Sequence, residues 1–140
     1  MESIELFAGA GGLALATANA GFHHRALLEW NPNACATLRR NKADGLAQLR
    51  DAAILEGDIS CVDFAPYCGD VELVSGGPPC QPFSIGGKHA GMDDSRNMFP
   101  HAIRMIIIVD NVRVFAWQSS AFILFLFMND LHCAHILDRI

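Results

Sequence analysis

Four short apolar segments, each followed by glycine, proline or an acidic residue, constrain the fold of this chain more than any other feature. Their lengths and flanking residues predict β-strands. Helical stretches or short connections separate them, which is typical of a parallel sheet. We therefore expect an α/β fold with a doubly wound sheet. The predicted strands are SIELF at 3–7, RALLEW at 25–30, AAILEGD at 52–58 and VELVSGG at 71–77.

Two segments between these strands have the signals of helices. The stretch LALATANA at 13–20 is rich in alanine and leucine, and Gly21 follows where a glycine commonly ends a helix. Asn31 before Pro32 is typical of an N-cap followed by proline in the first turn, which predicts a helix over 32–40. Beyond about residue 105 the sequence is more apolar, and its periodicity does not separate helix from strand.

Composition narrows the class of protein. A chain of 140 residues, 51% of them apolar, is expected to form one domain with a real core. The net charge of −5 argues against nonspecific binding of nucleic acid or anionic membrane by the whole surface. Five cysteines without a C-x-x-C pair fit a reducing compartment. No basic leader is seen, and the longest apolar run, 121–128, is too short to span a bilayer, so we expect a soluble, cytoplasmic chain without membrane contact.

A glycine-rich stretch lies between the first predicted strand and the first predicted helix. GAGGLA at 9–14 fits the pattern G-x-G-x-x-A, which lets the backbone approach a ligand at a helix N-terminus. Glu29 follows Gly9 by 20 residues, where a carboxylate can accept both ribose hydroxyls of an adenosine. The alternative is a plain glycine-rich turn. These residues predict a nucleotide-like cofactor, without distinguishing a dinucleotide from another adenosine compound.

Two further side chains are placed to contact such a cofactor. Trp30 could stack on an adenine, and its alternative role is that of a core aromatic. Asp58, at the end of the third predicted strand, can reach the adenine amino group, or it is an ordinary turn or cap aspartate.

The segment SGGPPCQPFS at 75–84 holds one thiol, Cys80, on a loop stiffened by prolines. Core packing does not require a loop of this stiffness. Nucleophilic catalysis does require a rigid loop that holds one thiol near a cofactor. Only a thiolate attacks, so nearby donors or cations must lower the pKa of the thiol. The alternative, a small buried hydrophobe, suits Cys35 or Cys61 better. The HCAH stretch at 132–135 lacks the spacing of a zinc site, and we expect no metal.

Five motifs occur in order: ELFAGAGGLALATANAGF, EWNPNACATLRRN, GDIS, LVSGGPPCQPFS and GMDDSRNMF. Over residues 3 to about 106 the chain resembles the N-terminal catalytic half of DNA (cytosine-5) methyltransferases. The resemblance implies an incomplete Rossmann-like, class I S-adenosylmethionine-dependent fold, of the kind found in restriction–modification systems. It also implies methyl transfer from S-adenosylmethionine to C5 of a cytosine flipped out of double-stranded DNA, through a covalent bond from Cys80 to C6.

The resemblance assigns roles residue by residue. The cofactor site would contain Phe7, Ala8, Gly9, Gly11, Gly12, Leu13, Glu29, Trp30, Asp58, Ile59, Pro79 and Met98. Contacts to DNA or the active site would come from Gln81, Ser84 and Arg96. The polar segment after Cys80 looks like the family's mobile loop that closes over the extruded base.

The chain departs from the family pattern after Arg96. The family continues with a helix and a strand ending in Glu-Asn-Val, whereas the nearest match here is Asp110-Asn111-Val112, with a shorter acid that arrives early. Pro100 is expected to interrupt the helix. We expect a cofactor-binding catalytic half-domain at 1–112 and a tail without family resemblance at 113–140. The missing final helix should leave apolar surface exposed on the first strand, unless the apolar segment FAWQSSAFILFLFM at 115–128 covers part of it.

The sequence thus predicts a truncated cytosine-5 DNA methyltransferase with impaired activity. A complementing chain that carries the missing half could restore this activity. In a bacterium, we expect the protein to be associated with the nucleoid. The alternative is a non-catalytic remnant that binds S-adenosylmethionine or DNA. A nicotinamide-dependent dehydrogenase would explain the glycine loop but gives PPCQ at 78–81 no role.

Overall fold

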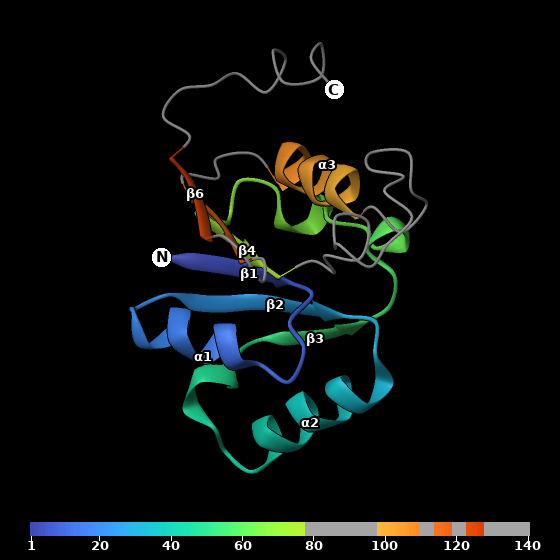
Figure 1. Ribbon diagram of the computed structural model, residues 1–140. Helices are drawn as coiled ribbons and strands as arrows, with labels where there is room; N and C mark the ends of the chain where they lie inside the picture. Colours follow the sequence, from blue (N-terminus) through green and yellow to red (C-terminus); the bar gives the residue numbers. More distant parts are fainter. Residues whose placement is uncertain (78–97, 110–113, 119–122, 128–140) are drawn as a thin grey trace.

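The computed structural model describes residues 1–77, 98–109, 114–118 and 123–127, which form one six-stranded sheet with helices on both faces (Figure 1). The strands are β1 (Glu2–Leu6), β2 (His23–Glu29), β3 (Ala53–Glu56), β4 (Leu73–Gly76), β5 (Val114–Gln118) and β6 (Ile123–Phe127). The α-helices are α1 (Gly12–Asn19), α2 (Pro32–Ala43) and α3 (Phe99–Val109), and the short 3-10 helices are η1 (Ala47–Leu49), η2 (Ile59–Cys61) and η3 (Ala65–Tyr67).

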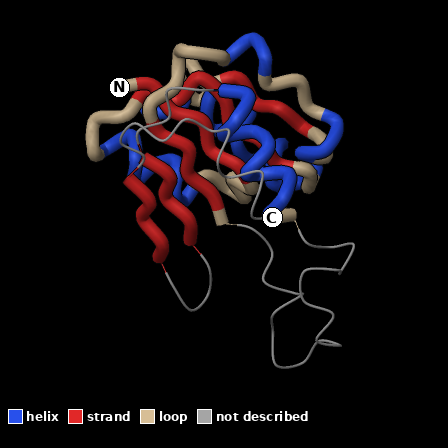
Figure 2. The backbone as a smooth tube through the Cα atoms, turned by 90° about the horizontal axis from the view of Figure 1, so that it is seen from above, coloured by secondary structure: helices blue, strands red, loops and turns tan. Residues whose placement is uncertain are grey.

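The strand order is β3-β2-β1-β4-β5-β6. All neighbouring pairs are parallel except β5 and β6, and Figure 2 shows these two strands at one edge of the sheet. The chain runs outward from β1 to β3 and then returns to the other side of β1 with β4. This reversal is the switch point of a doubly wound sheet, beside which ligands bind at the carboxyl ends of the strands. The predicted α/β class is confirmed.

Two apolar clusters cover the sheet. Ile4 and Leu6 of β1 belong to the cluster that includes Met105 of α3, whereas Leu27 of β2 packs with Leu38 of α2. Alternate residues of a strand point to opposite faces, so α3 covers one face, and α1 and α2 cover the other (Figure 1).

The exposure predicted for the first strand is wrong. Ile4 and Leu6 are fully buried, because β1 is central and α3 covers its apolar face. The opposite face of β1 carries Ser3 and Glu5, which are polar and also buried. Among the side chains that the structure describes, the large exposed hydrophobic ones are Met1 and Trp30.

The helix signals in the sequence are confirmed in α2. Asn31 is its N-cap, and its Oδ1 accepts hydrogen bonds from the backbone N–H groups of Asn33 and Ala34 at 2.9 and 3.2 Å. The helix continues to Ala43, past the predicted end. Gly21 follows α1 with φ 96°, as expected for a glycine after a helix.

The expectation that Pro100 interrupts a helix is wrong. α3 begins at Phe99, so the proline lies in the first turn, where its missing N–H is not needed. The apolar stretch that the sequence left undivided forms the end of α3 and the strands β5 and β6. These strands join the sheet of β1–β4. The boundary between a catalytic half-domain at 1–112 and a tail at 113–140 stays a prediction. None of the described helices is long and apolar enough to cross a membrane.

Candidate cofactor and active site

The loop after β1 has a backbone that favours glycine. Gly9 and Gly11 have φ of 55° and 95°, in the left-handed region, and Phe7 also has a positive φ of 57°. Ala8 anchors the loop, because its N–H donates to the carbonyl of Leu28 at 3.0 Å, and its carbonyl accepts from Gly11 at 2.9 Å. A Cβ added at Gly9 would meet no atom of the described residues within 4 Å, so this part of the protein leaves the space beside the backbone open. The glycine-rich stretch is therefore a shaped loop with room for a ligand.

The loop leads directly into α1. Gly12 is the first residue of the helix, and Leu13 follows in its first turn, half-buried. Gly11 precedes it and packs closely: a Cβ there would lie 2.8 Å from Cδ2 of Leu38. The N-terminus of α1, whose first N–H groups have no partner within the helix, thus lies at the carboxyl edge of the sheet, beside the glycine loop.

Glu29, the last residue of β2, joins the glycine loop to the start of α2. Its side chain is buried, and one carboxylate oxygen accepts the N–H of Gly9 at 2.8 Å. The other accepts the N–H groups of Trp30 and Asn31 at 3.0 and 2.8 Å. A carboxylate has about four acceptor positions, so three are used before any ligand binds. Contact with both ribose hydroxyls, as the sequence predicts, requires one backbone bond to be shared or released.

Trp30 lies beside this carboxylate at the same edge. Its side chain is 73% exposed, so the alternative role as a core aromatic is wrong, and its ring is available for stacking. Cys35 lies behind, fully buried, with its Sγ donating to the carbonyl of Glu29 at 3.3 Å, and burial raises the pKa of this thiol. The interpretation as a small buried hydrophobe is confirmed for Cys35 and wrong for Cys61, which is exposed.

Asp58 and Ile59 follow β3 at the carboxyl edge. Asp58 is the N-cap of η2, and its Oδ1 accepts from the hydroxyl and N–H of Ser60 at 2.7 and 2.8 Å. These hydrogen bonds lower the pKa of Asp58, so its exposed carboxyl is ionised at neutral pH. The side chain of Ile59 packs into the core on the α3 side. Met98, just before α3, is half-buried against the same cluster.

Several predicted residues lie outside the part of the chain that the structure describes. They are Pro79, Cys80, Gln81, Ser84, Arg96 and Asp110. Gly76, which ends β4 shortly before Cys80, pairs with Leu6 at the end of β1, next to the glycine loop. For Asp110, the described residues on either side belong to α3 and β5, so a helix precedes this position where the family pattern has a strand.

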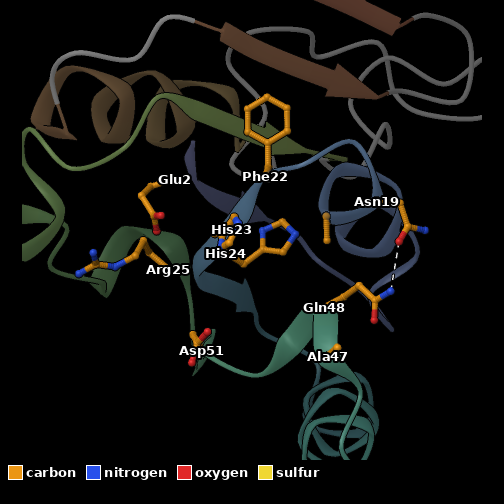
Figure 3. A pocket seen from close by; sticks show the side chains of 10 residues that line it. Glu2, Asn19, Phe22, His23, His24, Arg25, Ala47, Gln48 and Asp51 are labelled. Atoms are coloured by element: carbon orange, nitrogen blue, oxygen red, sulfur yellow. Dashed lines mark hydrogen bonds between the residues drawn. The ribbon is translucent and has the colours of Figure 1, made fainter.

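A pocket of about 520 Å³ lies at the amino-terminal ends of β1 and β2, on the side of the sheet away from the glycine loop (Figure 3). Its walls are formed by the starts of β1 and β2, the end of α1, the 3-10 helix η1 and the short segment just before β3. Among the described residues, none of those predicted to bind cofactor or DNA lines this pocket. The lining residues are Glu2, Ala18, Asn19, Phe22, His23, His24, Arg25, Ala47, Gln48 and Asp51. A ligand of a doubly wound sheet is not expected at this amino-terminal edge.

The sequence interpretation missed a group of buried polar side chains on the α1 side of the sheet. His24 is buried, with its two ring nitrogens at 3.0 Å from the Ser3 hydroxyl and 2.8 Å from the carbonyl of Ala14, and burial lowers its pKa. Glu5 is also buried, and the pattern S-x-E within a short strand was the signal that could have placed Ser3 and Glu5 on one face. No group of His, Cys, Asp or Glu able to hold a metal occurs among the described residues.

Comparisons with known proteins identify the family and the fold of this chain. The family model for C-5 cytosine-specific DNA methylases matches residues 1–112. The type II methyltransferase M.NgoMIV of Neisseria gonorrhoeae is 44% identical over 118 residues, which are 79% of this chain and 35% of that protein. M.NaeI of Lentzea aerocolonigenes is 39% identical over 150 aligned positions, which include all of this chain and 32% of that protein.

Two solved structures share the fold. A protein described as a prophage-encoded DNA modification methyltransferase of E. coli has a TM-score of 0.64 at 27% identity, over 85% of this chain and 32% of that chain. A glycopeptide N-methyltransferase, MtfA, in complex with S-adenosylmethionine has a TM-score of 0.53 at 16% identity, over 91% of this chain and 59% of that chain, which shows the fold alone. The chain spans about a third of the length of the two relatives above. Because the family model covers 112 of its 140 residues, the chain belongs to the C-5 cytosine-specific DNA methylases.

Proposed function

We propose that this chain is the cofactor-binding and nucleophile-bearing part of a DNA (cytosine-5) methyltransferase. The observation that carries the proposal is the junction of Glu29 with the backbone of Gly9 at 2.8 Å, beside the exposed Trp30. These groups lie at the carboxyl edge of the sheet, next to the strand reversal, where ligands of this fold class bind. Family membership supports methyl transfer and DNA as the substrate.

The described residues fit S-adenosylmethionine. Open space beside Gly9 permits close approach of a ligand to the backbone, Glu29 offers a buried acceptor for ribose hydroxyls, and Trp30 offers a free aromatic face. The rest of the glycine loop and the first turn of α1 belong to the same proposed site. We assign to it Phe7, Ala8, Gly11, Gly12 and Leu13, together with Asp58, Ile59, Pro79 and Met98. When bound, the cofactor supplies a methyl group on a positively charged sulfur.

Cys80 is the proposed nucleophile. Its thiolate would form a bond to C6 of a cytosine flipped out of double-stranded DNA, and the displaced electron pair would make C5 nucleophilic. After C5 has accepted the methyl group, a base removes the C5 proton, and the electron pair left by that proton expels the thiolate from C6. Gln81, Ser84 and Arg96 are the proposed contacts to DNA. The short stretch between Gly76 and Cys80 supports the placement of the thiol near the glycine loop.

Two candidates differ in what these residues do by themselves. Because the chain spans about a third of its relatives, we propose little turnover by this chain alone, and restoration by a complementing chain that carries the rest. The second candidate is a non-catalytic protein that binds S-adenosylmethionine or DNA. Association with the nucleoid belongs to the same proposal. The nicotinamide-dependent dehydrogenase is set aside, because family membership accounts for the glycine loop and for Cys80 together.

Calorimetry with S-adenosylhomocysteine tests the cofactor site. Replacing Trp30 by alanine should weaken binding by about 5-fold to 150-fold, because stacking of a base on an aromatic ring contributes about 1–3 kcal/mol. Asp51→Ala, at the opposite edge of the sheet, is the control and should bind like the parent. Absence of binding to the parent chain, or equal losses in both variants, would contradict the proposed site.

Mass spectrometry with DNA that contains 5-fluorocytosine tests the nucleophile. With S-adenosylmethionine present, a covalent adduct should form with the parent chain and with Cys61→Ser, which changes an exposed cysteine outside the proposed site, but not with Cys80→Ser. Cofactor binding without any adduct would favour the non-catalytic candidate.

A further inference from the structure

Glu5 carries a buried carboxyl group. It is not among the residues predicted to contact the cofactor, and it has no role in the proposed chemistry. It is the penultimate residue of β1, and its side chain is only 1% exposed. One oxygen accepts a hydrogen bond from the hydroxyl of Ser75 on β4, at 3.3 Å. The other, Oε1, is buried and has no hydrogen-bond partner among the described residues. A buried acceptor without a partner is costly in a folded protein, so it calls for a functional explanation.

The position of Glu5 relates it to the proposed cofactor site. Glu5 pairs with Ser75 across the β1–β4 junction, which is where the strand order reverses. The glycine loop starts two residues later in the chain. Besides Ser75, the backbone of Ala14 in the first turn of α1 favours the ionised carboxylate and so opposes the rise in the pKa of Glu5 that burial causes. Glu5 therefore lies in β1 just before the glycine loop, and its carboxyl is held by Ser75 of β4 at the strand reversal.

Few charges surround this carboxyl among the described residues. On β2 its neighbour is the apolar Leu27, and His24 on the same face is neutral near pH 8 because burial lowers its pKa. α1 contains no charged side chain, and Ser75 on β4 is uncharged. The other buried carboxylate of this edge is Glu29, which three backbone N–H groups already bind. A charge on Glu5 is thus weakly screened and lacks a cationic partner in this part of the protein.

We propose that Glu5 discriminates by charge between the sulfonium cofactor and its demethylated product, because its ionised carboxylate attracts the cationic cofactor more strongly. This inference rests on the proposed function. With its amino-acid group as a zwitterion, S-adenosylmethionine carries one net positive charge, and S-adenosylhomocysteine carries none. The two ligands otherwise present the same adenosine and amino-acid groups. Loss of the methyl group would remove the attraction, which favours exchange of the product for fresh cofactor.

The sign of the pH dependence follows from linkage. Burial raises the pKa of Glu5 to about 8, and a nearby positive charge favours the ionised form and lowers this pKa. Binding of the cationic cofactor therefore releases a proton, and its affinity rises with pH until the free protein is itself ionised. If bound cofactor lowers the pKa by about one unit, the preference for cofactor over product grows roughly sevenfold between pH 6.0 and pH 8.5.

Calorimetric titrations of the full chain with each ligand at pH 6.0 and pH 8.5 test the inference. The amino groups of both ligands titrate in the same range. Glu5→Gln is therefore measured in parallel, because it keeps the shape of the side chain, removes its charge and leaves the titration of the ligands unchanged. The preference for S-adenosylmethionine should grow roughly sevenfold more with pH in the parent than in Glu5→Gln.

The outcomes separate this inference from the proposed function. Equal pH profiles for the parent and Glu5→Gln overturn the inference and leave the cofactor site standing. Failure of the parent to bind either ligand overturns both. Where circular dichroism shows Glu5→Gln to be unfolded, Ser75→Ala replaces it. That variant removes a hydrogen bond that favours the ionised carboxylate, so the rise in preference should move to higher pH. An unmoved rise overturns the inference.

Discussion

Replacing Gly76 by alanine should weaken the junction between β1 and β4, although glycine is usually a poor strand residue. Gly76 ends β4 opposite Leu6, and a Cβ there would lie 2.9 Å from the carbonyl oxygen of Leu6 and 3.3 Å from its Cβ. The nearer atom belongs to the backbone of a central strand and cannot rotate away. The two strands would have to separate by about 0.5 Å to restore ordinary contact.

The magnitude follows from two opposing effects. Forcing an extra methyl group into a packed region costs about 1–3 kcal/mol. Alanine also restricts the unfolded chain more than glycine does, which contributes about 0.4–1 kcal/mol in the other direction. We expect Gly76→Ala to lower the free energy of unfolding by about 1–2 kcal/mol. Gly57→Ala is the matched control: its Cβ would meet nothing within 4 Å, and its φ lies outside the left-handed region.

Urea unfolding followed by far-ultraviolet circular dichroism gives the comparison. Gly76→Ala should lower the transition midpoint and Gly57→Ala should not, with slopes like that of the parent. Gly57→Ala should be equal to the parent or more stable by about 0.4–1 kcal/mol. If Gly76→Ala proves as stable as Gly57→Ala, the close approach of β4 to β1 is not a constraint, and the argument fails.

Three further substitutions probe the cofactor edge. Gly11→Ala should lower the free energy of unfolding by about 1–2 kcal/mol, because φ is 95° there, whereas Gly12→Ala, at the start of α1, should not; equal urea midpoints would contradict this. Asn31→Ala removes an N-cap that accepts two backbone N–H groups and should cost about 1 kcal/mol by thermal unfolding, unlike the exposed Asn33→Ala. Burial raises the pKa of Glu5 to about 8, so the folded state keeps a proton that the unfolded state loses near pH 4.5. The stability of the parent relative to Glu5→Gln should therefore fall as pH rises from 5 to 8, by at most about 1.4 kcal/mol per pH unit, and a flat difference in urea unfolding would refute the raised pKa.

Local signals in the sequence were sufficient for much of the fold. The apolar segments near 3–7, 25–30, 52–58 and 71–77 each contain a strand, because alternation and flanking glycine or acid act over a few residues. Asn31 and Gly21 were identified in the same way, since a cap contacts only its own helix end. The spacing from Gly9 also drew attention to Glu29, whose carboxylate accepts the N–H of Gly9, while its contact with a ribose stays a prediction.

Contacts between distant residues needed the tertiary structure. Glu5 and Ser75 are 70 positions apart, and their hydrogen bond exists only because β4 pairs with β1 after the chain has returned from β3. The exposure of Trp30 was undecided for the same reason, because burial depends on what the rest of the chain covers.

The sequence by itself determined the α/β class, the caps at Asn31 and Gly21 and the glycine loop, because these features depend on interactions between neighbouring residues. The tertiary structure alone decided which edge of the sheet gathers Gly9, Glu29 and Trp30, and which carboxyl is buried beneath them. The physical reason is that strand order and burial come from packing between segments far apart in the chain, and local propensity carries no information about that packing.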